Sequence, residues 1–122
     1  MTVEELLRPP TEAEVAGALG RFSAEVRRVY GPRLRGIVLF GSRARGDHRP
    51  DSDADVAVVL ADGDWRFWDE KMKLVDLAYH VSLDQNLTIQ PWPFRESEWK
   101  GREPSPHGEL VRSARRDARS LP

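Results

Sequence analysis

The chain has 122 residues, of which 39% are hydrophobic and 32% are charged. A chain of this length forms one domain that buries about two thirds of the surface exposed when it is unfolded. The 19 lysine and arginine residues almost balance the 20 aspartate and glutamate residues, so no overall positive field attracts the chain to nucleic acid or anionic lipid. The absence of cysteine excludes disulfides and thiolate metal sites.

The beginning of the chain and its apolar runs predict where the protein resides. The first ten residues lack the basic start and the apolar core of a signal peptide. No apolar run approaches the roughly 18 residues that a membrane-spanning helix needs. We therefore expect a cytoplasmic protein with no membrane partner.

The first predicted element is an amphipathic helix over residues 11–30. Thr11 and Glu14 have the spacing of a capping box. Apolar residues then recur every three or four positions, at Val15, Leu19, Phe22, Val26 and Val29. The Gly31-Pro32 pair ends the helix.

Two short strands follow the first helix. The apolar run over 36–40 predicts a buried strand that leads directly into a Gly-Ser pair. Residues 46–52 are polar and form the expected loop. The run over 55–60 predicts the second strand, which the Asp62-Gly63 turn closes.

A second helix is predicted to begin at Asp64, which is suited to cap it. Its apolar residues step by three and four along one face. They are Trp65, Trp68, Met72, Val75 and Tyr79. We expect this face, including Trp65 and Trp68, to lie in the core. The partly buried face is wide, because Leu74, Leu77 and Val81 flank it.

Residues 86–94 alternate in the manner of a third strand, but Pro91 and Pro93 interrupt the pattern. Proline cannot donate a hydrogen bond to a sheet, so this strand should lie at an edge or end near Gln90. A short basic helix is expected over residues 109–118.

These elements predict an α/β (α+β) fold. Its short mixed sheet carries two main helices on one face, and a short helix lies near the C-terminus. We expect a single domain over residues 1–122, with a core over about 11–94 and a basic C-terminal extension over about 95–122.

The residues that indicate chemistry follow the first strand and precede the second. Gly41 lets the backbone turn sharply and approach a ligand, and Ser42 adds a hydroxyl beside backbone N–H groups, which suits phosphate. Asp53 and Asp55 are two residues apart, so on extended backbone they project to one face and can share a cation. Either motif alone is typical of an ordinary turn or a solvated loop, but the combination at the strand ends is much more specific.

The segment GSRARGDHRPDSDADVAVVL resembles the signature of the DNA polymerase β-like nucleotidyltransferase superfamily. Its compactness is similar to that of the minimal nucleotidyltransferases, and the resemblance covers residues 34–94. It implies the minimal nucleotidyltransferase fold and transfer of a nucleoside monophosphate from a nucleoside triphosphate to a hydroxyl. By resemblance, Gly41 and Ser42 would hold the triphosphate, and Asp53 and Asp55 would be catalytic and bind two Mg²⁺ ions.

Three further side chains near this segment have open roles. Arg43 and Arg45 follow the turn closely enough for a guanidinium to bind nucleotide phosphate. The alternative is that both only solvate the loop. Trp92 is expected to stack on a base or to pack against a partner.

One departure from the family pattern concerns a third carboxylate, which its fully active members supply from a later strand. The matching segment here contains no acid, because Thr88 and Gln90 occupy the face where an aspartate would be expected. Asp84 could substitute only if that strand began earlier. The nucleotide site is therefore better supported than the catalytic step.

The function predicted first is transfer of AMP from ATP to a protein hydroxyl. By resemblance, such a protein would be the antitoxin of a HEPN-domain toxin. The alternative is a catalytically weakened nucleotide- and Mg²⁺-binding module that neutralises a partner by contact. With no second domain to hold an acceptor, the chain is expected to use a partner protein or a homo-oligomer, and transfer RNA ranks below a protein as partner.

Overall fold

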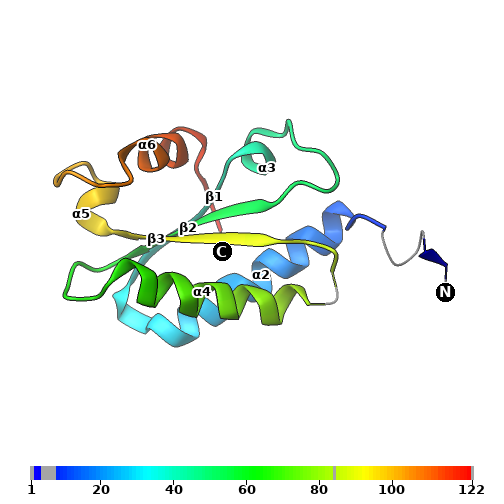
Figure 1. Ribbon diagram of the computed structural model, residues 1–122, viewed down its shortest axis with the longest axis horizontal. Helices are drawn as coiled ribbons and strands as arrows, with labels where there is room; N and C mark the ends of the chain where they lie inside the picture. The colour runs from blue at the N-terminus through cyan, green and yellow to red at the C-terminus, as the bar shows by residue number, and fades with distance from the viewer. Residues whose placement is uncertain (1, 4–7, 84, 122) are drawn as a thin grey trace.

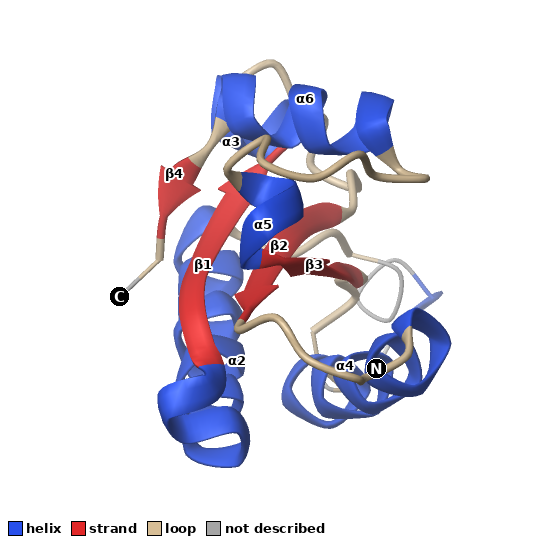
Figure 2. Ribbon diagram, turned by 90° about the vertical axis from the view of Figure 1, so that its left-hand side faces the viewer, coloured by secondary structure: helices blue, strands red, loops and turns tan. Residues whose placement is uncertain are grey.

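The computed structural model describes residues 2, 3, 8–83 and 85–121. A four-stranded mixed sheet forms its centre, in the order β3 (Ile89–Arg95), β2 (Ala54–Leu60), β1 (Leu34–Phe40) and β4 (Arg119–Ser120). Figures 1 and 2 show helices α2 and α4 on one face of this sheet, and helices α3 and α6 on the other. The predicted fold class, with two main helices on one face and a short helix near the C-terminus, is confirmed.

Helix α2 (Glu12–Tyr30) begins at the predicted capping box. The Thr11 hydroxyl accepts a hydrogen bond from the Glu14 backbone at 3.1 Å, and the Glu14 carboxylate accepts one from the Thr11 backbone at 2.9 Å. Gly31 ends the helix with a φ of 54° and opens a 3-10 turn, η1 (Gly31–Arg33). Four of the five predicted stripe residues are buried, and the fifth, Val29, is 46% exposed.

Strands β1 (Leu34–Phe40) and β2 (Ala54–Leu60) are antiparallel neighbours and confirm the first two predicted strands. Their register sets Phe40 opposite Asp55. The last residue of β1 therefore lies beside the first residues of β2, and the Gly-Ser pair comes directly after that point.

Strand β3 (Ile89–Arg95) is an edge strand, as predicted, and runs parallel to β2. It passes through both prolines rather than ending near Gln90, because only one of its sides bonds to the sheet. Alternate residues of a strand turn their backbone groups to opposite sides, so Pro91 and Pro93 occupy the positions that face away from β2. Residue 84 lies outside the described residues, and the strand begins five residues after it.

Helix α4 (Phe67–Ser82) differs most from its prediction. It begins at Phe67 rather than near Asp64. The flanking residues Leu74, Leu77 and Val81 pack in or against the core, as predicted, but the centre of the predicted buried face is exposed. Trp68, Met72 and Tyr79 are 67%, 56% and 59% exposed. The buried positions are Glu70, Lys71, Leu74, Ala78 and Ser82.

The error has a physical reason in the partners of two charged residues. Glu70 accepts a hydrogen bond from the Tyr30 hydroxyl at 2.9 Å, and Lys71 donates to the Pro91 carbonyl. A charged side chain that has such hydrogen-bond partners can be buried. A prediction from hydrophobic periodicity nevertheless assigns each charged residue to the exposed face of the helix. Trp65 precedes the helix and is half-buried, with its indole donating to the Ala61 carbonyl at 2.9 Å.

The second face of the sheet carries the shorter elements. They are α3 (Ser42–Arg45), α5 (Glu96–Trp99) and α6 (Gly108–Asp117). Strand β4 (Arg119–Ser120) follows α6 and forms the other edge of the sheet, where it pairs with β1. On the second face, Phe40, Ala57 and Phe94 form a buried cluster with Val111 and Ala114 of α6. In the described part of the chain, no helix has the length and apolar character needed to cross a membrane.

Candidate active site

Gly41 and Asp55 are in contact at the junction of β1 and β2. Gly41 has a φ of 77°, a backbone conformation that L side chains rarely adopt. A Cβ atom at this position would lie 2.5 Å from Oδ2 of Asp55. The carboxylate therefore occupies the space that any side chain at Gly41 would need, and the turn lies against it.

Ser42 begins the single turn of helix α3. Its carbonyl accepts hydrogen bonds from the backbone N–H groups of Gly46 at 2.9 Å and Asp47 at 3.2 Å. Gly46, with a φ of 87°, then ends the turn. The first N–H groups of a helical turn have no partner within the helix, so this compact loop has the geometry that favours a phosphate group.

Asp53 and Asp55 lie close enough to influence each other. Asp53 is exposed just before β2, and Asp55 is half-buried at its start. Burial, and then the Asp53 carboxylate, raise the pKa of Asp55. A bound cation would relieve both effects, since it removes the repulsion and replaces lost hydration.

The donor set fits a magnesium ion completed by substrate. Among the described residues, no group of three or more His, Cys, Asp and Glu side chains is arranged to hold a metal ion. Mg²⁺ is commonly bound by only one or two carboxylates, with water and phosphate oxygens completing its octahedron. Asp53 and Asp55 fit one such ion when a nucleotide supplies the other oxygens.

Gln90 takes the place beside Asp55 where a third carboxylate was expected. The two residues are paired in the parallel register of β2 and β3, so their side chains project to the same face. Thr88 precedes β3, and its carbonyl accepts a hydrogen bond from Ala54 at 2.9 Å. The register therefore identifies Gln90, rather than Thr88, as the neighbour of Asp55.

Lys71 and Trp92 surround Asp55 and were missed as a pair by the sequence analysis. The Trp92 indole hydrogen-bonds to the Asp55 carboxylate. The Lys71 ammonium lies 3.7 Å from the centre of the Trp92 ring, and the residue is only 6% exposed. Burial lowers the pKa of Lys71 to about 8, and Asp55 opposes this shift. No sequence motif signals this lysine, because its position depends on the packing of α4 against β3.

Arg43 has different surroundings from those expected of a phosphate ligand. Its side chain is 3% exposed. Its Nε donates to the Ser52 carbonyl, and an Nη donates to the Pro50 carbonyl, both at 3.0 Å. The guanidinium therefore fixes the loop that precedes Asp53 through hydrogen bonds to its carbonyl groups.

Arg45 lies near enough to Asp55 for its positive charge to oppose the rise in the pKa of that carboxyl group. It is 43% exposed and pairs with Asp47 at 3.1 Å and with Asp117 of α6 at 2.7 Å. These partners link the loop to the end of α6. Arg45 is thus the arginine of the pair with solvent access.

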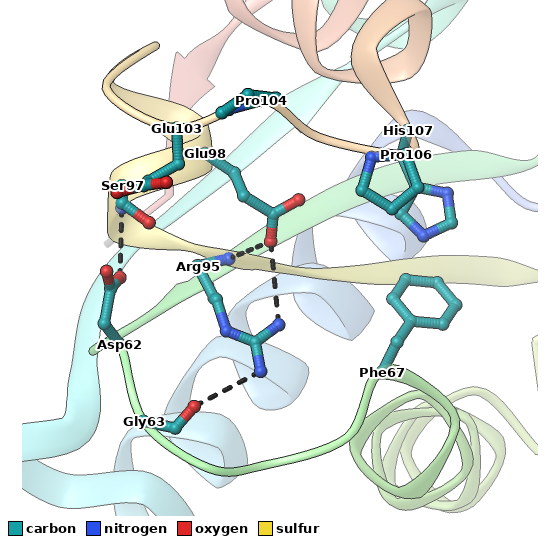
Figure 3. A pocket seen from close by; sticks show the side chains of 10 residues that line it. All are labelled: Asp62, Gly63, Phe67, Arg95, Ser97, Glu98, Glu103, Pro104, Pro106 and His107. Atoms are coloured by element: carbon teal, nitrogen blue, oxygen red, sulfur yellow. Dashed lines mark hydrogen bonds and ion pairs between the residues drawn. The ribbon is translucent and has the colours of Figure 1, made fainter.

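A pocket of about 380 Å³ lies at the opposite end of the sheet, where β2 and β3 end. Figure 3 shows Arg95 and Glu98 on one side of it, and Phe67 and His107 on the other. The two rings stack with centres 4.4 Å apart. Neither Gly41 nor Asp55 lines this pocket, so it is separate from the candidate active site.

Comparison with known proteins gives one family and several relatives. Residues 19–113 match the family described as "Nucleotidyltransferase domain", which covers most of the chain. Over 84 residues, the chain is 27% identical to the "Putative protein adenylyltransferase MJ0141" of Methanocaldococcus jannaschii, covering 69% of this chain and 83% of the relative.

Two solved structures have a similar fold. The first is a nucleotidyltransferase-type structure from Sulfolobus solfataricus, with a TM-score of 0.51, 27% identity and coverage of 75% of this chain and 77% of that one. The second is described as "the toxin-antitoxin with AMP-PNP", with a TM-score of 0.51, 22% identity and coverage of 81% and 68%. The family match spans the glycine turn, both aspartates and all of β3. The chain belongs to the nucleotidyltransferase domain family.

Proposed function

We propose that this protein transfers AMP from ATP to a hydroxyl group on a partner protein, with release of pyrophosphate and of the hydroxyl proton. The observation that carries the proposal is the contact between the Gly41 turn and Asp55, with Asp53 beside it. Family membership supports the reaction class, and the adenylyltransferase relative supports AMP as the transferred group.

The residues of the site have distinct proposed roles. The turn at Gly41 and Ser42 holds the terminal phosphates, and Arg45 offsets part of their charge. Asp53 and Asp55 hold Mg²⁺, which would neutralise charge on the phosphates during in-line transfer. Arg43 keeps Asp53 in position through its bonds to the preceding loop.

The partner is proposed from the family resemblance to be a HEPN-domain toxin, with this chain as its antitoxin. A structure with the same fold is described as a toxin–antitoxin with AMP-PNP, and that description is compatible with the proposal. A protein acceptor also suits a chain whose charge is nearly balanced.

The test is transfer of label from α-³²P-ATP to the product of the neighbouring gene in the presence of Mg²⁺. We expect label on the acceptor protein with the wild type, and none with Asp53→Asn or Asp55→Asn. Asp51→Asn is the matched control, since it removes an exposed carboxylate from the same loop. Equal labelling by Asp51→Asn and the wild type, with loss in the other two variants, supports the proposal; label that survives Asp55→Asn contradicts it.

A second candidate function is a nucleotide- and Mg²⁺-binding module that neutralises its partner by contact alone. The observation that favours it is Gln90 beside Asp55, with the Lys71 ammonium nearby instead of an acid. Neither side chain can act as a carboxylate base toward the acceptor hydroxyl. Neutralisation of the partner that survives Asp53→Asn and Asp55→Asn, without any label transfer, would favour this module over the enzyme.

A further inference from the structure

Helix α4 presents an exposed apolar stripe that the candidate active site does not use. The stripe consists of Trp68, Met72, Val75, Tyr79 and Leu83. Four of these residues are 56% to 67% exposed, and Val75 is half-buried. They follow one another at intervals of three or four residues and therefore lie along one side of the helix. Figure 1 shows α4 as an outer layer of the molecule, on the side of the sheet opposite α3.

Such a stripe is unusual on a free protein surface. Single exposed apolar residues are normal, but a contiguous row of large ones marks an interaction surface. A groove of about 350 Å³ continues the stripe toward the start of β3, between Tyr79, Leu83 and Leu87. The apolar surface is therefore continuous across the end of α4.

The neighbouring edge strand is a poor site for a partner. Pro91 and Pro93 remove two N–H donors from the free side of β3, and Lys71 occupies the Pro91 carbonyl. An added strand would find few backbone partners there. A partner on this side of the molecule therefore meets the helix face rather than the strand.

Charged residues along one flank of the stripe indicate which partner fits. They are Asp69, Lys73, Asp76 and His80, and all four are exposed. Within the helix, Lys73 lies 3.6 Å from the buried carboxylate of Glu70, and His80 lies 3.7 Å from Asp76 in a pair that is exposed on both sides. The exposed pair of His80 and Asp76 contributes little and can exchange partners at small cost. Glu70 keeps its hydrogen bonds from Tyr30 and Arg33 when Lys73 turns to another partner.

Two copies of α4 packed antiparallel would bring these flanks together. In an isologous pair with its two-fold axis near Val75, residues about equally far from Val75 on either side lie opposite each other. Lys73 then faces Asp76 of the second copy, and Asp69 faces His80 of the second copy. A parallel pair would instead set the charged flank against the flank beside β3, where Ala78 and Ser82 are buried.

We propose that the α4 stripe is a self-association surface, where a second copy of this chain docks with its α4 antiparallel. The match of opposite charges carries the choice of occupant, and the apolar stripe supplies most of the buried surface. The helix has only 16 residues, so the interface is small. We expect a dimer with a dissociation constant in the micromolar range.

The test is sedimentation equilibrium of the full chain over a range of concentrations. We expect Met72→Glu to weaken dimerisation at least about tenfold, since it would bury an unpaired charge. Val29→Glu is the matched control, because Val29 is an exposed apolar residue on a different helix, α2. It should leave the dimer unchanged. Thermal melts establish that each variant is folded.

Exchanging the charges of Lys73 and Asp76 tests both the antiparallel orientation of the two helices and the identity of the partner as a second copy of this chain. Lys73→Glu and Asp76→Lys should each weaken the dimer by about 3- to 30-fold, because each change appears twice in a symmetric pair. The double variant Lys73→Glu/Asp76→Lys should restore the wild-type dissociation constant to within about twofold, since opposite charges again face each other. A monomer at all concentrations, a dimer unaffected by Met72→Glu, or a double variant that restores nothing would overturn the proposal.

Discussion

Replacing Lys71 with methionine should change how the stability of the protein depends on pH. Lys71 is buried beside the Trp92 ring, and burial lowers its pKa to about 8. In the unfolded chain, a lysine has a pKa of about 10.4. Between these values the unfolded chain holds more protons at this position than the folded protein, so the free energy of unfolding of the wild type rises as the pH rises.

The size of the effect follows from the shift. A difference of about 2.4 pKa units corresponds to at most about 3 kcal/mol, and we expect 1–3 kcal/mol as an approximate range. The methionine in Lys71→Met does not titrate, so the free energy of unfolding of this variant lacks this rise with pH. Its stability relative to the wild type should therefore fall by about 1–3 kcal/mol between pH 7 and pH 10.5.

Urea denaturation in EDTA at a series of pH values measures this difference. Lys73→Met is the matched control, because Lys73 lies on the same helix but its side chain is 62% exposed. Its curve should stay parallel to that of the wild type. A Lys71→Met curve that also stays parallel from pH 7 to pH 10.5 would refute the reasoning, since it would mean that the buried ammonium keeps an ordinary pKa.

Three further substitutions test the candidate site. Gly41→Ala should lower the free energy of unfolding by about 1–3 kcal/mol and abolish ATP binding in calorimetry. The reasons are the positive φ at Gly41 and the contact of an added Cβ atom with Asp55. Gly20→Ala is the control, because Gly20 lies in open space on α2, and it should be neutral or stabilising by up to about 1 kcal/mol. Arg43→Met should cost about 1–3 kcal/mol in urea and speed proteolysis of the 46–53 loop, because two carbonyls lose their donor; an unchanged cleavage rate would contradict this. Gln90→Asp should bind Mn²⁺ about tenfold more tightly in calorimetric titration, since a third carboxylate would join Asp55, and an unchanged affinity would contradict the register argument.

The sequence alone predicted the parts of the fold that depend on local signals. The capping box at Thr11, the two strands that flank the glycine turn and the edge position of β3 are all confirmed. Each of these depends on residue types within a few positions of one another. The assignment of Gly41, Ser42, Asp53 and Asp55 to nucleotide and metal stays a prediction, although the structure brings Gly41 and Asp55 into contact.

The parts that sequence could not predict depend on contacts between distant segments. Periodicity cannot show that Glu70 meets the Tyr30 hydroxyl or that Lys71 meets the Pro91 carbonyl. It therefore centred the buried face of α4 on Trp68, Met72 and Tyr79, which are exposed. Likewise, Arg43 follows the Gly-Ser turn directly, and this position suggested that its guanidinium binds a nucleotide phosphate. Its side chain instead points to carbonyls of its own loop, which only the folded chain reveals.

The contact between Gly41 and Asp55 also constrains how this chain can change over generations. A side chain at Gly41 would need the space that Oδ2 of Asp55 fills, 2.5 Å away. Replacing Asp55 would remove this clash but not the strain, because a φ of 77° is unfavourable for any L side chain. Position 41 is therefore held to glycine by two independent constraints, its backbone conformation and the neighbouring carboxylate, whereas a change at position 55 meets no clash from Gly41.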